Sequence, residues 1–171
     1  MITYVVIPEE RIKILRHKKE WIEEIEKLSK TKIEFGENQQ IIISGEDPIS
    51  VMRVRDIIRA LGRGFDYQSA LNLLDEEYFL EIINLKEFAK TRNRQIELKG
   101  RVIGSEGSAK QRIEEMTNTK IAVHGKTISI IGKWNDVQKA REAIEMLLKG
   151  AMHNTVYRFL ERSYNDRSIS R

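Results

Sequence analysis

The sequence contains no cysteine, only two prolines and three histidines. The absence of cysteine excludes disulfide frameworks, thiolate metal sites and cysteine nucleophiles. His17, His124 and His153 lie too far apart in the sequence to form a local ligand motif, so we expect no metal and no cofactor. No run approaches the ~18 consecutive apolar residues that a membrane-spanning helix requires. We therefore expect no membrane partner and a cytoplasmic location.

The two signs of charge nearly balance. The 30 Lys and Arg residues exceed the 26 Asp and Glu residues, which gives a net charge of +4 at pH 7. This small excess permits an acidic partner without requiring one. With 171 residues, 40% of them hydrophobic, the chain is long enough for one ordinary domain or two small ones.

An internal repeat organises the chain. Seven identities share one offset of 88 positions: Ile25-Glu26, Thr31-Lys32-Ile33 and Ile42-Ile43 recur as Ile113-Glu114, Thr119-Lys120-Ile121 and Ile130-Ile131. The apolar patterns around them also agree. The sequence therefore predicts two copies of one supersecondary unit.

The first copy begins with an apolar, β-branched strand over residues 2–7, closed by Pro8. From Glu9 to Leu28, helical apolar spacing then predicts two short helices joined by the basic turn at residues 16–19. Strands at residues 32–35 and 40–43 follow. Asp47-Pro48 opens a last helix that Gly62 and Gly64 end.

The second copy repeats this order, which is β-α-α-β-β-α. Its strands are expected at residues 78–83, 120–123 and 127–131, and Asn135 or Asp136 should cap its last helix. Residues 85–95 have no counterpart in the first copy, and we expect them to form a surface element.

The helical pair of the second copy is split by Gly104, Ser105, Glu106 and Gly107. A helix entered through two glycines exposes unpaired backbone N–H groups, and the missing side chains let a phosphate approach them. An isolated pair of glycines is more often a simple turn. Here the β-α-α-β-β-α order matches K-homology (KH) modules, whose GXXG loop clamps about four nucleotides of single-stranded backbone.

Basic residues surround this loop. Between residues 90 and 112 seven Lys or Arg residues stand against two Glu residues. Arg101 and Lys110 flank the loop most tightly and are the best candidates for phosphate contacts, with Lys99 and Arg112 further away. Solvated helix faces explain such residues equally well. The apolar residues Val102, Ile103 and Ile113 either floor a groove for bases or belong to the core.

Two features oppose tight RNA binding. Glu106 places a negative charge inside the loop, unless it turns away to pair with Lys110 or Arg101. In the first copy, Arg16, His17, Lys18 and Lys19 stand where the second has its loop. Their Cβ atoms would obstruct a backbone clamp, so this block either steers RNA through its charge or is a solvated charge run. Trp21 either stacks a base or packs in the core.

Several segments together resemble one family. They are residues 60–65 (ALGRGF), 78–85 (YFLEIINL), 99–107 (KGRVIGSEG), 112–116 (RIEEM), 125–127 (GKT) and 156–162 (VYRFLER). Nearly the whole chain resembles the archaeal two-KH-domain ribosome-assembly proteins related to the eukaryotic partner of the small-subunit rRNA endonuclease. The family commonly has basic residues where this chain has Ser105-Glu106, and a GXXG loop in its first domain.

The resemblance implies a non-enzymatic factor that binds single-stranded RNA at the 3′ end of small-subunit rRNA, mainly through the second loop. It also implies two protein partners, the translation initiation factor α subunit and the rRNA-processing endonuclease. The implied fold is α/β (α+β), with two tandem type I KH domains packed together and a C-terminal helix. We expect KH domain 1 at residues 1–64, a helical connector at 65–77, KH domain 2 at 78–150, and a C-terminal helix and tail at 151–171.

Two alternatives remain at this point. A nucleotide hydrolase is disfavoured because no Lys-Ser or Lys-Thr follows the glycines, and no catalytic cluster of His or carboxylates is visible. We therefore expect no enzymatic activity. A protein-binding scaffold with weak RNA affinity agrees with Glu106 and with the altered first turn. The tail, with Val156, Tyr157, Arg167 and Arg171, is a docking helix or a contact for a partner or rRNA.

Overall fold

The computed structural model describes residues 1–169, with side chains up to residue 165. The chain divides into two compact units, Met1–Leu80 and Glu81–Arg171. Arg171 lies outside the described residues, as does the side chain of Arg167, so the tail prediction is not tested there. Within the described range, no helix is long and apolar enough to cross a membrane.

The first unit follows the predicted order of elements. It consists of β1 (Ile2–Val6), α1 (Glu9–His17), α2 (Lys19–Ser29), β2 (Thr31–Phe35), β3 (Gln40–Gly45), α3 (Pro48–Gly62), α4 (Tyr67–Leu71) and the 3-10 turn η1 (Asn72–Leu74). Asp47 caps α3 as expected, because its carboxylate accepts a hydrogen bond from the Ile49 N–H at 3.1 Å. The segment predicted as a connector contains α4 and η1, which both contact α3.

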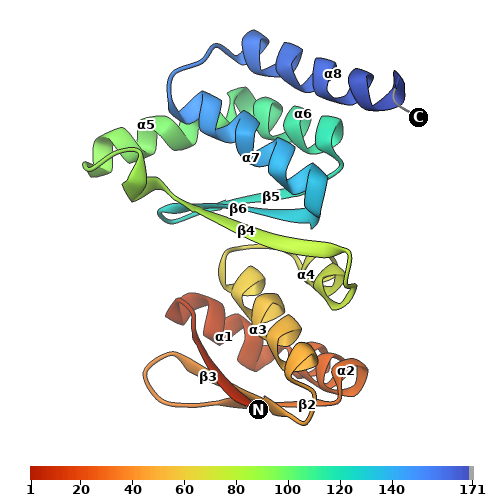
Figure 1. Ribbon diagram of the computed structural model, residues 1–171. Coiled ribbons are helices and arrows are strands. Elements are labelled where there is room, and N and C mark those ends of the chain that lie inside the picture. The colour runs from red at the N-terminus through yellow and green to blue at the C-terminus, as the bar shows by residue number, and fades with distance from the viewer. Residues whose placement is uncertain (170–171) are drawn as a thin grey trace. The chain divides into compact units, whose positions relative to one another are not determined.

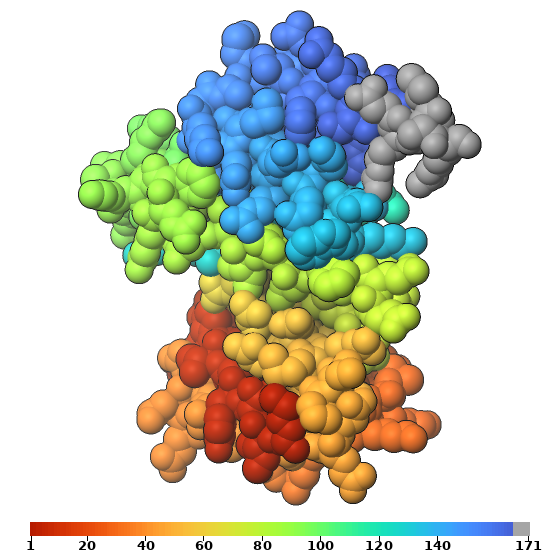
Figure 2. Space-filling view, viewed as in Figure 1, coloured from red at the N-terminus to blue at the C-terminus, as the bar shows by residue number. Residues whose placement is uncertain are grey.

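Its sheet has the order β1-β3-β2, and both pairs are antiparallel. The helices cover one face of this sheet (Figure 1), and Ile41 and Ile43 of β3 are fully buried beneath them. The other face carries Ile2, Tyr4 and Val6, which are 55–65% exposed. Figure 2 shows β1, in red, at the molecular surface. Side chains of β1 point alternately to the two faces of the sheet, and only one of these faces is buried.

The second unit repeats this arrangement with the sheet order β4-β6-β5. Its elements are β4 (Tyr78–Asn84), the 3-10 turn η2 (Leu85–Glu87), α5 (Arg92–Ile103), the 3-10 turn η3 (Ser105–Gly107), α6 (Ser108–Thr117), β5 (Lys120–His124), β6 (Thr127–Lys133), α7 (Trp134–Leu148) and α8 (His153–Ile169). Its core includes the fully buried Ile113, Ile128 and Ile144, and α8 adds Val156 and Leu160.

The residues that repeat at an offset of 88 form the same hydrogen-bonded support in both units. In the first, the Ser29 hydroxyl donates to the Ile25 carbonyl at 2.6 Å and bonds the Thr31 hydroxyl. The Glu26 carboxylate accepts the N–H of Ile33 at 2.9 Å. These bonds fasten the end of α2 to the start of β2.

In the second unit, Thr117 donates to the Ile113 carbonyl at 2.7 Å and bonds Thr119. The Glu114 carboxylate accepts the N–H of Ile121 at 2.8 Å. Each of these atoms belongs to the residue 88 positions after its counterpart. The predicted repeat of one supersecondary unit is therefore confirmed.

One expectation about the second unit is wrong, and another holds only in part. Its last helix is not capped by Asn135 or Asp136. It begins at Trp134, after Lys133, which makes no side-chain capping bond. Asp136 lies inside the first turn, where a carboxylate interacts favourably with the helix dipole, and accepts a hydrogen bond from the Tyr164 hydroxyl at 3.0 Å. Asp136 therefore bonds a side chain of α8 and does not cap α7.

Residues 85–95 are not simply a surface element. Leu85 is fully buried, and its N–H donates to the Lys126 carbonyl at 2.8 Å. Gln95 is also buried, and its side-chain amide finds a partner there by donating to the Ala89 carbonyl at 2.9 Å. The insertion therefore closes one end of the core and leads into α5.

Candidate nucleic-acid interface

The turn between α5 and α6 has a backbone that favours glycine. The φ angles of Gly104, Glu106 and Gly107 are 74°, 54° and 79°. The Gly104 N–H closes the last turn of α5 by donating to the Gly100 carbonyl at 2.8 Å, and the Gly107 N–H donates to the Gly104 carbonyl at 3.3 Å. The loop is thus a tight turn between two helices.

Its two glycines serve different purposes. A Cβ added at Gly104 would lie 2.6 Å from the Ala109 Cβ and 2.7 Å from the Ala109 nitrogen, so close packing of the loop against α6 requires glycine there. A Cβ added at Gly107 would meet nothing within 4 Å. Gly107 precedes α6, which has no side-chain cap. The missing side chain therefore leaves an open approach to the N-terminal N–H groups of a helix.

The charges near the loop are only partly engaged. The ammonium group of Lys110 lies 3.4 Å from the Glu114 carboxylate, and Lys99 is half-buried on α5. Ser105 and Glu106 are exposed, and over the residues with described side chains Glu106 forms no ion pair. The pairing of Glu106 with Lys110 or Arg101 is therefore absent. Its charge faces solvent beside the open approach.

The apolar residues near the loop separate by burial. Val102 and Ile113 are fully buried and belong to the core. Ile103, the last residue of α5, is half-buried just before Gly104. Of the three residues weighed as the floor of a base-binding groove, Ile103 alone reaches the surface.

Arg101 and Arg112 both face the C-terminal helix. The Arg101 guanidinium donates to the Ala151 carbonyl. The Arg101 carbonyl accepts a hydrogen bond from His153 Nε2 at 2.7 Å, so that nitrogen carries the proton. The Arg112 guanidinium carbon lies 4.0 Å from the centre of the Tyr157 ring. The start of α8 therefore braces both sides of the loop, which no local pattern in the sequence indicated.

Comparisons with known proteins agree with this geometry. Residues 79–165 match the family described as eukaryotic type KH-domain (KH-domain type I). A KH domain-containing protein of Methanocaldococcus jannaschii is 43% identical over 161 residues, covering 91% of this chain and 71% of the relative. The chain belongs to this KH-domain family. The family includes the eukaryotic partner of the small-subunit rRNA endonuclease, and the resemblance seen in the sequence is confirmed.

Several solved structures are similar to almost the whole chain. A protein of unknown function from Aeropyrum pernix matches with a TM-score of 0.94 and 34% identity, over 99% of this chain and 94% of that one. Dim2p from Pyrococcus horikoshii matches with a TM-score of 0.87 and 43% identity, over 95% of this chain and 99% of that one. A chain of the P. horikoshii a/eIF2alpha-aDim2p-rRNA complex matches with a TM-score of 0.89 and 42% identity, over 97% of this chain and 95% of that one. A KH-type α/β fold is therefore shown.

The equivalent turn of the first unit differs from this KH loop. Arg16 and His17 end α1 and Lys19 begins α2, so only Lys18 lies between the helices, with a φ of −106°. The expected four-residue basic turn is wrong, because the helices continue into it. All four side chains are exposed. This turn presents side-chain charge and no open backbone.

Aromatic rings hold part of this basic block in place. The Arg16 guanidinium lies 5.0 Å from the centre of the Phe35 ring, and the Lys18 ammonium group 5.2 Å from that of Trp21. Trp21 itself is half-buried and stacks on Tyr67, with ring centres 4.8 Å apart and planes 2° from parallel. The Trp21 ring therefore packs against residues of its own unit.

A groove of about 710 Å³ lies beside this block and was not foreseen from the sequence. Ile12, Lys13 and Arg16 of α1 line one side, and residues 36–39 line the other. Glu9 and Glu37 contribute acidic groups to the same lining. The groove therefore has mixed charge. Among the described residues, no cluster of His, Asp or Glu suited to a metal ion occurs in either unit.

Proposed function

We propose that the chain is a single-stranded RNA-binding protein that acts in small ribosomal subunit biogenesis. In this proposal, the 3′ end of small-subunit rRNA binds through the loop from Gly104 to Gly107. The observation that carries it is the open space beside Gly107 at the uncapped start of α6. A phosphate fits this position because backbone N–H groups and the positive end of the helix dipole point toward it.

The comparisons support the choice of RNA. One matching structure is titled as a complex of a/eIF2alpha, aDim2p and rRNA. Lys99, Ile103 and Lys110 flank the loop and are half-buried, so part of each side chain reaches the surface. We assign them to RNA contact, together with Arg101 and Arg112, whose positions α8 fixes.

The first unit is, in our proposal, a second KH domain in tandem with a degenerate loop. The shared element order, the equivalent sheet order and the repeated support at Glu26 and Glu114 favour this. Its exposed Arg16, Lys18 and Lys19 would attract RNA through long-range charge, without clamping the backbone.

Fluorescence anisotropy of a labelled oligonucleotide that copies the rRNA 3′ end tests the main proposal. We would compare wild type with Gly107→Asp at two salt concentrations. Gly107 is preferable to Gly104, since a side chain at Gly104 would collide with Ala109. We expect Gly107→Asp to lower the affinity at least tenfold, because the carboxylate would occupy the phosphate position and repel it.

Gly64→Asp is the matched control. Gly64 is an exposed glycine of the first unit with a φ of 95°, so this change adds the same charge at another glycine with positive φ. Its effect should be less than twofold, and circular dichroism should show both variants folded. Equal affinities of wild type and Gly107→Asp would refute the loop as the RNA site.

A second candidate function is a protein-binding scaffold with weak RNA affinity. The exposed Glu106 favours it, as does the complex in which a matching chain occurs with a/eIF2alpha. The initiation factor α subunit and the rRNA-processing endonuclease are the proposed protein partners. Titrating the labelled chain with the α subunit and with the rRNA oligonucleotide separates the two functions. Tight binding of the subunit with no binding of RNA would favour the scaffold.

A further inference from the structure

Arg112 and Tyr157 form a stacked pair beside the glycine loop. The Arg112 guanidinium carbon lies 4.0 Å from the centre of the Tyr157 ring, so the guanidinium covers the ring. Arg112 is nevertheless exposed, whereas Tyr157 is half-buried. The pair is thus anchored on its tyrosine side and open to solvent on its arginine side.

Contacts connect this pair to the loop through His153. The His153 ring centre lies 6.3 Å from that of Tyr157, and His153 Nε2 donates to the Arg101 carbonyl. Along α6, Arg112 follows Gly107 by five residues, which is about 7.5 Å of helix. The pair therefore lies less than two turns of α6 away from the position assigned to a phosphate.

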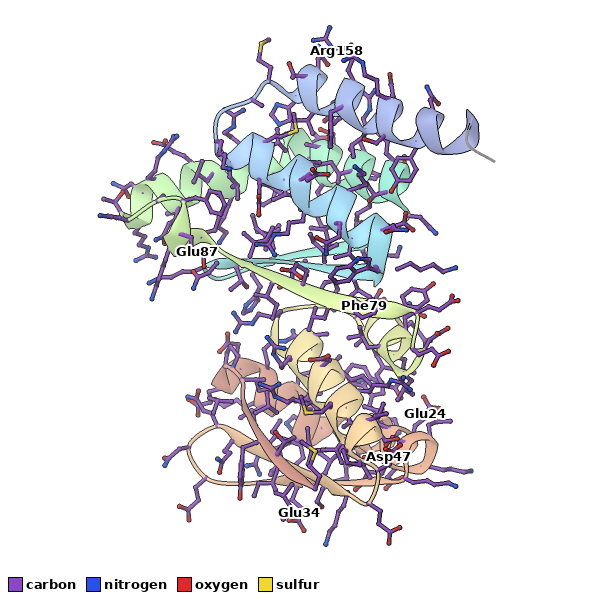
Figure 3. All side chains as sticks on the ribbon, in the orientation of Figure 1. Glu24, Glu34, Asp47, Phe79, Glu87 and Arg158 are labelled. Carbon is purple, nitrogen blue, oxygen red and sulfur yellow. The ribbon has the colours of Figure 1, made fainter. Side chains whose placement is uncertain are left out.

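The charge of this surface suits a polyanion. The first turn of α8 contains no acidic residue. Arg158, on the same helix, is exposed and points away from α7 (Figure 3). The nearest acidic groups on α6 already have partners: Glu115 accepts from the Gln111 amide at 3.2 Å, and Glu114 binds Lys110 and the Ile121 N–H. Glu106 in the loop and the exposed Glu161, one turn after Tyr157 on α8, are the remaining negative charges nearby.

We propose that the Arg112–Tyr157 pair is a stacking platform for one base of single-stranded RNA, next to the nucleotides held by the glycine loop. This inference rests on the proposed function. Single-stranded RNA is commonly bound by bases that stack on aromatic rings or on guanidinium planes. A guanidinium that is already held over a tyrosine ring loses less side-chain freedom when a base covers its exposed side.

The test uses RNAs of two lengths. A core of five nucleotides from the rRNA 3′ end is compared with cores extended by three nucleotides at the 5′ or the 3′ side. Anisotropy with the full chain should show that one extension raises the affinity about tenfold, the gain typical of one stacked base. Replacing the added nucleotides by abasic ones, which keep their phosphates, should remove most of this gain.

Variants then locate the gain. Tyr157→Leu should remove most of it while leaving affinity for the five-nucleotide core within about threefold. Arg112→Gln should remove most of it as well. Tyr157→Trp retains a stacking ring and should preserve it, which separates stacking from a folding defect. The pair Lys139 and Phe159 is the matched control, because it joins α7 to α8 at 5.5 Å. Lys139→Gln and Phe159→Leu should keep the gain.

The outcomes distinguish the platform from the proposed function. If the core binds and depends on Gly107, but neither extension adds affinity, the platform is wrong and the proposed function stands. If the extension gains affinity equally in Arg112→Gln and wild type, or equally with abasic nucleotides, the platform is also wrong. If the core does not bind wild type at all, both proposals fail together.

Discussion

The two helix–helix turns of the chain occupy equivalent positions, yet only one of them exposes its backbone. Both follow the first helix of a unit, and both lead into a second helix. In each unit a glutamate of that second helix, Glu26 or Glu114, accepts a hydrogen bond from the next strand. Between α5 and α6, three residues with positive φ open the turn. Between α1 and α2, Lys18 alone separates the helices. The support and the loop are therefore separable parts of the fold.

The largest expected effects come from the shared support. Ile25→Ala and Ile113→Ala remove fully buried side chains at equivalent positions. Each should lower the free energy of unfolding by about 2–5 kcal/mol, because a cavity remains in a packed core. Urea unfolding measures this, with the exposed Ile14→Ala as control. A cost below about 1 kcal/mol for either variant would break the equivalence of the units.

A second comparison concerns the two loop glycines. Gly104 has φ 74° and ψ 179°, a region that is essentially limited to glycine, and faces Ala109. We expect Gly104→Ala to cost about 3 kcal/mol through backbone strain and overpacking. Gly107→Ala, in open space, should cost about 1 kcal/mol. Thermal or urea unfolding of both variants decides the matter, and equal costs would contradict the assigned packing role of Gly104.

Reciprocal changes of charge sharpen the comparison of the turns. Glu106 and Lys18 lie 88 positions apart and are both exposed. Glu106→Lys should raise RNA affinity about threefold to tenfold and steepen the dependence of log K on log salt by about 0.7, one more neutralised phosphate. Lys18→Glu should lower affinity by less than about threefold. Anisotropy titrations over a range of salt measure both, and the reverse ranking would place the RNA on the first unit.

The smallest effect concerns Tyr67, a feature of the first unit alone. Burial, and then its hydrogen bond to Glu24, raise the pKa of the Tyr67 phenol well above its usual value. Because folding favours the protonated phenol, its stabilising effect is present below pH 10 and is lost at higher pH. Ultraviolet titration of wild type against Tyr67→Phe should show one phenol ionising late. Glu24→Gln should bring that ionisation to lower pH, and an unchanged titration would exclude the bond.

Much of the fold follows from the sequence because the repeat is visible in it. The strands and helices were predicted to within a few residues, since apolar spacing and turn residues mark them locally. The capping residue of α7 was predicted wrongly, because the Asp136 carboxylate accepts a hydrogen bond from Tyr164 of a distant helix. The burial of Leu85 and Gln95 likewise depends on partners that folding alone brings near.

The candidate site divides in the same way. The glycine loop could be predicted, because two glycines between the two helices of a β-α-α-β-β-α unit indicate a turn with positive φ angles. The roles of Arg101 and Arg112 could not. Their partners, Ala151 and Tyr157, lie 50 and 45 residues further along the chain. No local pattern connects such positions, and only the packing of α8 brings them together.

The brace on Arg101 has a consequence for the order in which the protein matures. His153 is synthesised 52 residues after Arg101. At the usual pace of translation, 5–20 residues per second, this is a delay of about 3–10 s. During that interval the residues of the glycine loop have been synthesised, but the hydrogen bonds that Arg101 makes with Ala151 and His153 cannot form. The surface around the glycine loop therefore cannot be complete until α8 has been synthesised.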